Sequence, residues 1–171
     1  MTRKRLLSTA LLCMVLLASC NKQTVRRDAT IGNEVFQVSM PVGKKVIHPV
    51  HGMEEWFAVG PMKGEGTTKA NGVAQSHFFV DGTTSATVNL NIQPAPKGFR
   101  FVAWLRKPGA VERIRLDALV NPFHDVRHLV TVEVAKDLRA YTDVLVTLER
   151  TSGPDESDPV QATGVLKVQK R

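Results

Sequence analysis

The chain has 171 residues, of which 43% are hydrophobic and 6% aromatic, and its formal net charge is +7. This length accommodates one domain with attached segments, because domains typically contain about 100–200 residues. A mean hydropathy of −0.10 and a charged fraction of 23% exclude a polytopic membrane protein and an acidic disordered chain. Two cysteines are too few for a disulfide-dense mini-protein or a four-thiolate zinc site.

The N-terminus has the pattern of a secretory signal peptide. Arg3, Lys4 and Arg5 precede an apolar run at residues 6–17. As a helix, this run would be about 18 Å long at roughly 1.5 Å per residue, which is short of the ~30 Å hydrocarbon core of a membrane. A basic start, a short apolar stretch and a small-residue end are typical of a cleaved signal. We therefore expect residues 1–19 to be removed.

The apolar run ends in Leu17-Ala18-Ser19-Cys20. This sequence resembles the lipobox of bacterial lipoproteins. The resemblance implies that a signal peptidase recognises Leu17, Ala18 and Ser19, and that the Cys20 thiol receives acyl chains such as palmitate and becomes the new N-terminus. Two or more acyl chains hold a protein stably at a membrane, whereas one chain gives only marginal binding. The expected location is the bacterial cell envelope, with the chain lipid-anchored to a membrane and its domain outside the cytoplasm.

Processing changes the composition of the mature chain. Cys13 is removed and Cys20 is acylated, so we expect neither a free thiol nor a disulfide. The signal peptide carries three of the 23 basic residues and none of the 16 acidic residues, which leaves a net charge of +4. This mild charge and the expected compartment argue against nucleic acid as a partner. The polar residues 20–34 predict a lipidated tether.

Residues 35–71 predict an N-terminal extension with one or two strands. Residues 35–40 have the pattern of a strand that Pro41 ends, and residues 46–50 are its candidate partner. Glycines are frequent from residue 51 to residue 72, which favours loops with one short strand at residues 56–59.

Residues 72–170 predict an all-β domain. Alternation at residues 85–92, with Ala86, Val88, Leu90 and Ile92 on the inward face, is typical of a half-buried antiparallel strand. Asp81-Gly82 before it is a hairpin signal, because both residues tolerate a positive φ. Further strands are expected at residues 75–80, 99–106, 112–119, 127–134, 144–149 and 164–169, with one helical turn at 137–141. About seven strands with regular turn signals predict an immunoglobulin-like antiparallel β-sandwich, in which Trp104 and Tyr141 are core residues.

Several motifs of this domain occur in the order found in a known family. They are Phe101-Val102-Ala103-Trp104-Leu105, the strand at 114–119, and the turn at 137–141 followed by a strand ending in Thr147-Leu148-Glu149. The segment thus resembles the C-terminal extracytoplasmic domain of anti-sigma-K factors, which implies a β-sandwich with a sensing or binding role. Full-length members carry a cytoplasmic sigma-binding domain and a transmembrane helix. Here a lipid on Cys20 replaces both, so no direct sigma factor binding is expected.

Two functions remain open. The first is a non-catalytic lipoprotein whose sandwich serves binding, sensing or envelope structure, without catalytic residue, cofactor or metal, and whose partner is an envelope protein, glycan or wall component. The alternative is an envelope metal-dependent hydrolase that uses His124, His128 and nearby carboxylates. The spacing of His124 and His128 suits zinc on a helix, but they fall in a predicted loop and strand. His48 and His51 would join them only if the extension folds close by.

Overall fold

A computed structural model describes residues 30–31, 34–35, 45–153 and 158–170. The signal peptide, the lipobox with Cys20 and most of the tether lie outside the described residues, as does most of the strand expected at residues 35–40. The chain divides into two compact units, Met1–Pro41 and Val42–Arg171. In the first unit the described residues form one short antiparallel pair, β1 (Thr30–Ile31) and β2 (Glu34–Val35).

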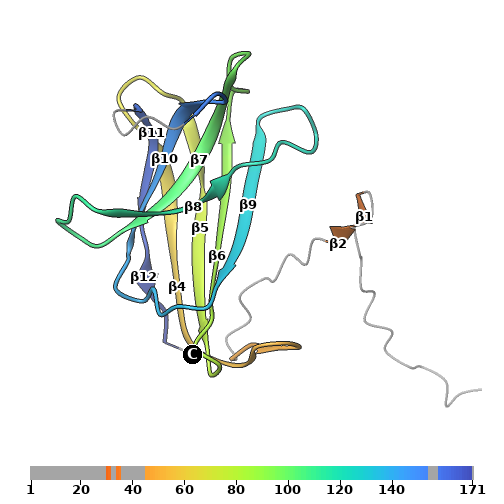
Figure 1. Cartoon of the computed structure of the whole chain (residues 1–171), viewed down its shortest axis with the longest axis vertical. Coiled ribbons are helices and arrows are strands. Elements are labelled where there is room, and N and C mark those ends of the chain that lie inside the picture. Colours follow the sequence, from red (N-terminus) through yellow and green to blue (C-terminus); the bar gives the residue numbers. More distant parts are fainter. Residues whose placement is uncertain (1–29, 32–33, 36–44, 154–157, 171) are drawn as a thin grey trace, which may run out of the picture. The chain divides into compact units, whose positions relative to one another are not determined.

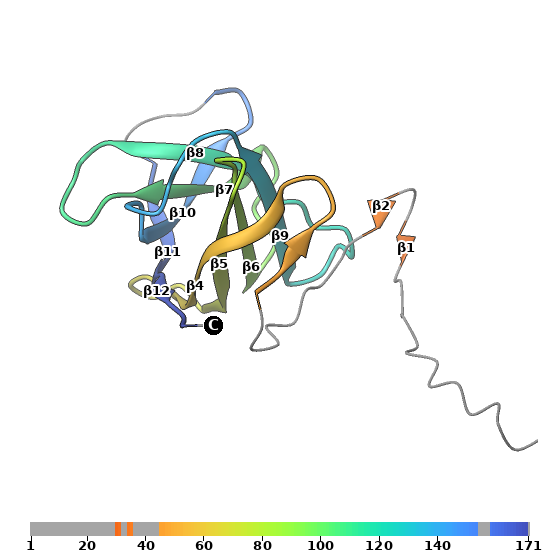
Figure 2. The same cartoon turned by 90° about the horizontal axis from the view of Figure 1, so that it is seen from below.

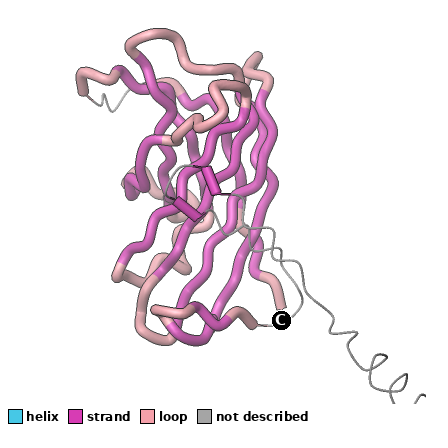
Figure 3. The backbone as a smooth tube through the Cα atoms, turned by 90° about the vertical axis from the view of Figure 1, so that its right-hand side faces the viewer, coloured by secondary structure: helices cyan, strands magenta, loops and turns pink. Residues whose placement is uncertain are grey.

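The described residues of the second unit form strands joined by turns and loops, without a helix (Figures 1 and 3). The strands are β3 (Ile47–His48), β4 (Gly52–Gly64), β5 (Ala70–Phe79), β6 (Thr84–Ile92), β7 (Phe99–Arg106), β8 (Arg113–Ala118), β9 (Arg127–Val134), β10 (Asp143–Arg150), β11 (Val160–Val165) and β12 (Lys167–Val168). The prediction of an all-β domain is therefore confirmed, and β7 and β9 have the bounds that the sequence predicts.

The strands form one antiparallel sheet in the order β8-β7-β10-β11-β4-β5-β6-β9, with β3 and β12 paired to β4. The sheet curves back on itself, as Figure 2 shows along the strands, and a bridge between Val120 and Leu129 joins its two ends. The seven strands from β5 to β11 divide between two halves as in an immunoglobulin-like sandwich, except that the fourth strand, β8, lies beside the third, β7. One half consists of β5, β6 and β9, and the other half consists of β7, β8, β10 and β11. The predicted sandwich is confirmed, and β4 joins its two halves.

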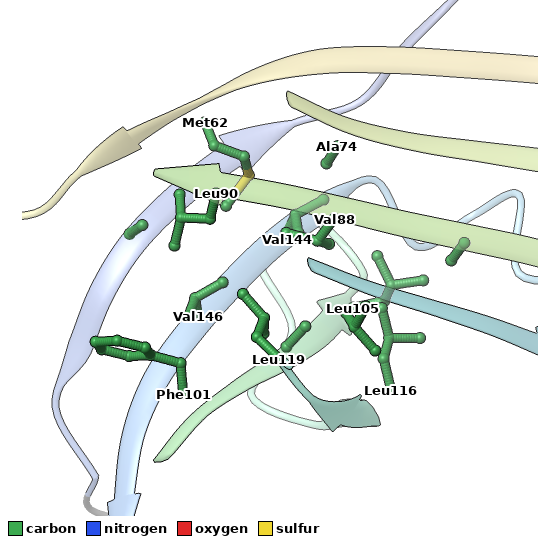
Figure 4. Packing of buried hydrophobic residues seen from close by; sticks show 14 of the residues in the cluster. Met62, Ala74, Val88, Leu90, Phe101, Leu105, Leu116, Leu119, Val144 and Val146 are labelled. Carbon is green, nitrogen blue, oxygen red and sulfur yellow. The ribbon is translucent and has the colours of Figure 1, made fainter. Parts of the chain in front are cut away.

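The hydrophobic core lies between the two halves of the sheet. The residues predicted to face inward on β6 are buried, with exposed fractions of 2% for Ala86, 1% for Val88, 1% for Leu90 and 4% for Ile92. Figure 4 shows that Val88 and Leu90 point towards the side chains of β10. The facing residues come mainly from β7, β8 and β10: Phe101, Ala103, Leu105, Leu116, Val144 and Val146. The domain is therefore held together by apolar packing of alternating strand residues.

The long strand β4 replaces the loops expected between residues 51 and 72. It pairs with β5 along one side and with β11 and β12 along the other. Its glycines mark close backbone contacts, since a Cβ atom on Gly60 would lie 2.0 Å from the carbonyl oxygen of Val165. Residues 46–50 were expected to pair with residues 35–40. Instead, residues 47–48 pair with the start of β4.

The helical turn expected at residues 137–141 is also absent from the described chain. The Asp137 carboxylate accepts a hydrogen bond from the backbone N–H of Arg139 at 3.0 Å. It also forms an ion pair with the guanidinium of Arg139 at 2.7 Å. This local arrangement competes with helix formation, because a short acidic side chain satisfies backbone donors in a turn. The turn places Leu138, which is 1% exposed, in the core.

Candidate functional site

The first structural element of the second unit is a hairpin formed by β3 and the start of β4. Ile47 pairs with Met53, and His48 pairs with Gly52. The turn between them is organised by the imidazole of His48, whose Nδ1 accepts hydrogen bonds from the backbone N–H groups of Val50 at 3.3 Å and His51 at 3.2 Å. A histidine next to a proline thus acts as an internal cap for the turn.

His51 joins this hairpin to two other elements. Its Nδ1 lies 2.7 Å from Asp81 Oδ2 in the turn between β5 and β6, and its Nε2 lies 3.1 Å from Glu133 Oε2 on β9. The hydrogen bonds to Asp81 and Glu133 raise the pKa of His51 above 6.5. The hydrogen bonds from His51 and the backbone of Thr83 lower the pKa of Asp81 below 3.8. The imidazolium form is favoured because both ring nitrogens then donate to carboxylates.

Aromatic contacts complete this group of side chains. The rings of His48 and His51 stack with centroids 4.7 Å apart, and both lie against Phe79, at 5.2 and 5.6 Å. The Nε2 of His48 lies 3.9 Å from Glu133 Oε1. We call His48, His51, Asp81 and Glu133 the histidine cluster. It fixes the hairpin on the body of the domain through two other elements, the turn between β5 and β6 and the strand β9.

A second polar cluster lies on the outer face of the other half of the sandwich. Glu149 on β10 accepts two hydrogen bonds from Arg115 on β8, at 2.8 and 3.0 Å, although its side chain is only 1% exposed. The indole N–H of Trp104 donates to the hydroxyl of Thr147 at 2.9 Å. The guanidinium groups of Arg113 and Arg115 lie 4.3 and 5.2 Å from the Trp104 ring. Trp104 therefore packs on this outer face, and the prediction that it is a core residue is wrong.

Tyr141, by contrast, packs against the core, as predicted. Its position just before β10 is the place of the tyrosine corner in immunoglobulin-like sandwiches. Its backbone N–H donates to the carbonyl of Leu138 at 2.9 Å.

An open hollow of about 560 Å³ lies beside this second cluster. It is lined from five strands and carries three cationic side chains, Lys63, Arg106 and Lys167, and two carboxylates, Glu65 and Asp143, so cations exceed anions by one. Arg106 pairs with Asp143 at 3.0 Å. Since apolar atoms of β10 and β11 form much of the lining, the hollow suits a ligand with an anionic group and an apolar part.

The structure separates the four histidines considered in the sequence. His128 lies at the start of β9, whereas Glu133, which contacts His48 and His51, is five residues further along that strand. At about 3.3 Å per residue this separation is roughly 16 Å. His124 lies in the loop before β9 with a φ of 54°.

His128 has a structural role. Its Nδ1 lies 3.0 Å from the carbonyl oxygen of Val126, and its Nε2 lies 3.3 Å from the side-chain nitrogen of Asn121. The ring packs edge-on against Phe101 at 5.2 Å. Both ring nitrogens are thus engaged in hydrogen bonds. Among the residues that the structure describes, no three histidine or carboxylate side chains are grouped to hold a metal ion.

The sequence pattern did not reveal the histidine cluster. The only local signal was the pair His48 and His51, three residues apart beside a proline, because Asp81 and Glu133 are distant in sequence. The chain matches no family model, no curated protein and no solved structure. Within the described residues, no helix is long and apolar enough to span a membrane.

Proposed function

We propose that this protein is a lipoprotein of the bacterial cell envelope, which Cys20 anchors to a membrane and whose sandwich is a non-catalytic binding module outside the cytoplasm. The observation that carries the proposal is Leu17-Ala18-Ser19-Cys20 at the end of a basic and apolar N-terminal segment. A thiol at this position provides the nucleophile for acylation, and the small residues before it allow access of a peptidase to the backbone. The acyl chains then hold the domain at the membrane.

The domain supplies surfaces suited to binding. Immunoglobulin-like sandwiches present loops at both ends and sheet faces between them on a scaffold held by one core. The hollow combines the cations of Lys63, Arg106 and Lys167 with a partly apolar lining, and Arg106 is paired with Asp143. We expect its ligand to be an anionic group of an envelope protein, glycan or wall component. The resemblance to the extracytoplasmic domain of anti-sigma-K factors supports a sensing role of this kind without direct contact to a sigma factor.

Acylation is tested by replacing each cysteine in the full chain. The wild-type protein and Cys13→Ala should incorporate labelled palmitate, whereas Cys20→Ala should incorporate none and remain unprocessed. Cys13→Ala is the matched control because Cys13 lies in the same N-terminal segment. Incorporation of palmitate by Cys20→Ala would show that Cys20 is not the anchor.

A further inference from the structure

The hairpin of β3 and β4 exposes a group of large apolar side chains. Ile47 and Val50 are each 78% exposed, Val80 is 51% exposed and Met53 is 48% exposed. Ile47 and Met53 are cross-strand partners, so their side chains lie on the same face of the hairpin. The backbone N–H of Val80 donates to the carbonyl of Met53 at 3.1 Å, which places Val80 beside them. We call these four residues the apolar tip.

The histidine cluster keeps the apolar tip turned outwards. Neighbouring strand residues point to opposite faces, so the contact of His48 with Phe79 directs Ile47 away from the domain. His51 fixes the following turn through Asp81 and Glu133. The exposed residues are therefore held by a structured turn, and they cannot bury themselves against the domain without breaking these contacts.

The apolar tip also lies where the chain enters the second unit. The hairpin begins at Ile47, only 27 positions after the expected anchor at Cys20. Of the described strands in this unit, those of the hairpin have the shortest covalent connection to the lipid. Lys44 and Lys45 precede the hairpin and favour anionic lipid headgroups.

We propose that the apolar tip docks on the surface of the membrane that holds the lipid of Cys20, an inference that rests on the proposed function. Ile47 and Val50 enter the boundary between headgroups and acyl chains, as apolar side chains of peripheral proteins do. Figure 1 places the hairpin at one end of the unit, and Figure 2 looks onto that end. The loop between β8 and β9, with Phe123 at 41% exposure, lies towards the other end and remains available to a partner.

The depth of the hairpin is measured with a fluorescent probe on a single cysteine. The lipidated full chain with Val50→Cys carries an environment-sensitive label and is reconstituted in vesicles of phosphatidylethanolamine and phosphatidylglycerol that contain a nitroxide lipid quencher. Val111→Cys is the matched control, because Val111 is 96% exposed in the turn between β7 and β8. We expect at least threefold stronger quenching at position 50 than at position 111. Adding Ile47→Asp should remove most of this difference.

The outcomes separate the inference from the proposed function. Equal quenching at positions 50 and 111 in a protein that carries palmitate overturns membrane docking, while the lipid anchor stands. Absence of palmitate overturns both. A probe at position 50 that is shielded from water only in a dimer assigns the apolar tip to a second copy of the chain, which also overturns the inference. Unchanged tryptophan fluorescence of the Ile47→Asp variant checks that the domain remains folded.

Discussion

The ion pair of Arg115 and Glu149 allows a quantitative test of the outer-face cluster. Replacing Arg115 by methionine keeps an unbranched apolar stem beside Trp104 but removes both hydrogen bonds to Glu149. The remaining carboxylate is 1% exposed and keeps the hydroxyl of Thr147 at 3.3 Å. Removal of one partner from a buried pair destabilises a protein by about 3–5 kcal/mol. Because the side chain of Arg115 is 31% exposed, we expect a loss near the lower limit, about 3 kcal/mol.

The assay is urea unfolding of residues 21–171, produced without the signal peptide and without Cys20, followed by far-ultraviolet circular dichroism. Arg127→Met is the matched control, because Arg127 pairs with Asp125 at the surface, where the two side chains are 56% and 40% exposed. This substitution should lower the free energy of unfolding by less than about 1 kcal/mol. The double variant with Arg115→Met and Glu149→Met should recover much of the loss, since apolar replacement of a buried pair is often neutral. A loss in Arg115→Met no larger than that in Arg127→Met would refute the reasoning.

Two further predictions concern the hairpin and β4. The raised pKa of His51 contributes stability that is fully present below pH 6.5 and is lost as the pH rises through that raised pKa. The lowered pKa of Asp81 contributes stability above pH 3.8 that is lost as the pH falls through it. Amide protection of residue 51 in hydrogen exchange, corrected for intrinsic rates, should therefore be highest between about pH 4 and 6.5, and the loss of protection above this range should disappear in His51→Gln. Gly60→Ala should destabilise the domain by more than about 1 kcal/mol in urea unfolding, because its Cβ meets the carbonyl of Val165. Val111→Ala is the control and should have a smaller effect, because Val111 is 96% exposed in the turn between β7 and β8.

The sequence was sufficient for strands whose two faces differ in polarity. On β6 and β9 apolar and polar residues alternate, since one face meets the core and the other meets solvent, and both strands lie close to their predicted positions. The sequence was insufficient for β4, where Gly60, Pro61 and Gly64 indicate a loop by composition. Gly60 instead allows the close approach of the Val165 backbone, which depends on β11, a strand about 100 residues later in the sequence, and Gly64 allows the close approach of Thr68.

The candidate site shows the same limit. Acylation of Cys20 is a prediction from contiguous residues, and it needs no tertiary structure because the four residues of the motif are adjacent in the sequence. The histidine cluster instead combines one turn with Asp81 and Glu133, which are 30 and 82 residues away from His51. No local pattern connects them, and only the pairing of β6 with β9 brings their elements together. The same holds for Trp104, whose outward orientation follows from the register of β7 with β8 and β10.

The positions of these features give the hairpin a mechanical consequence. Under the proposed anchoring at Cys20, force on the domain would pass through the chain that enters the second unit at the hairpin. Its load passes to β9 through Glu133 and to the turn between β5 and β6 through Asp81, because His51 contacts both. Each of these elements is paired over most of its length within the core sheet. Under that proposal, the histidine cluster gives the load two paths in addition to β4, one through β9 and one through the turn between β5 and β6.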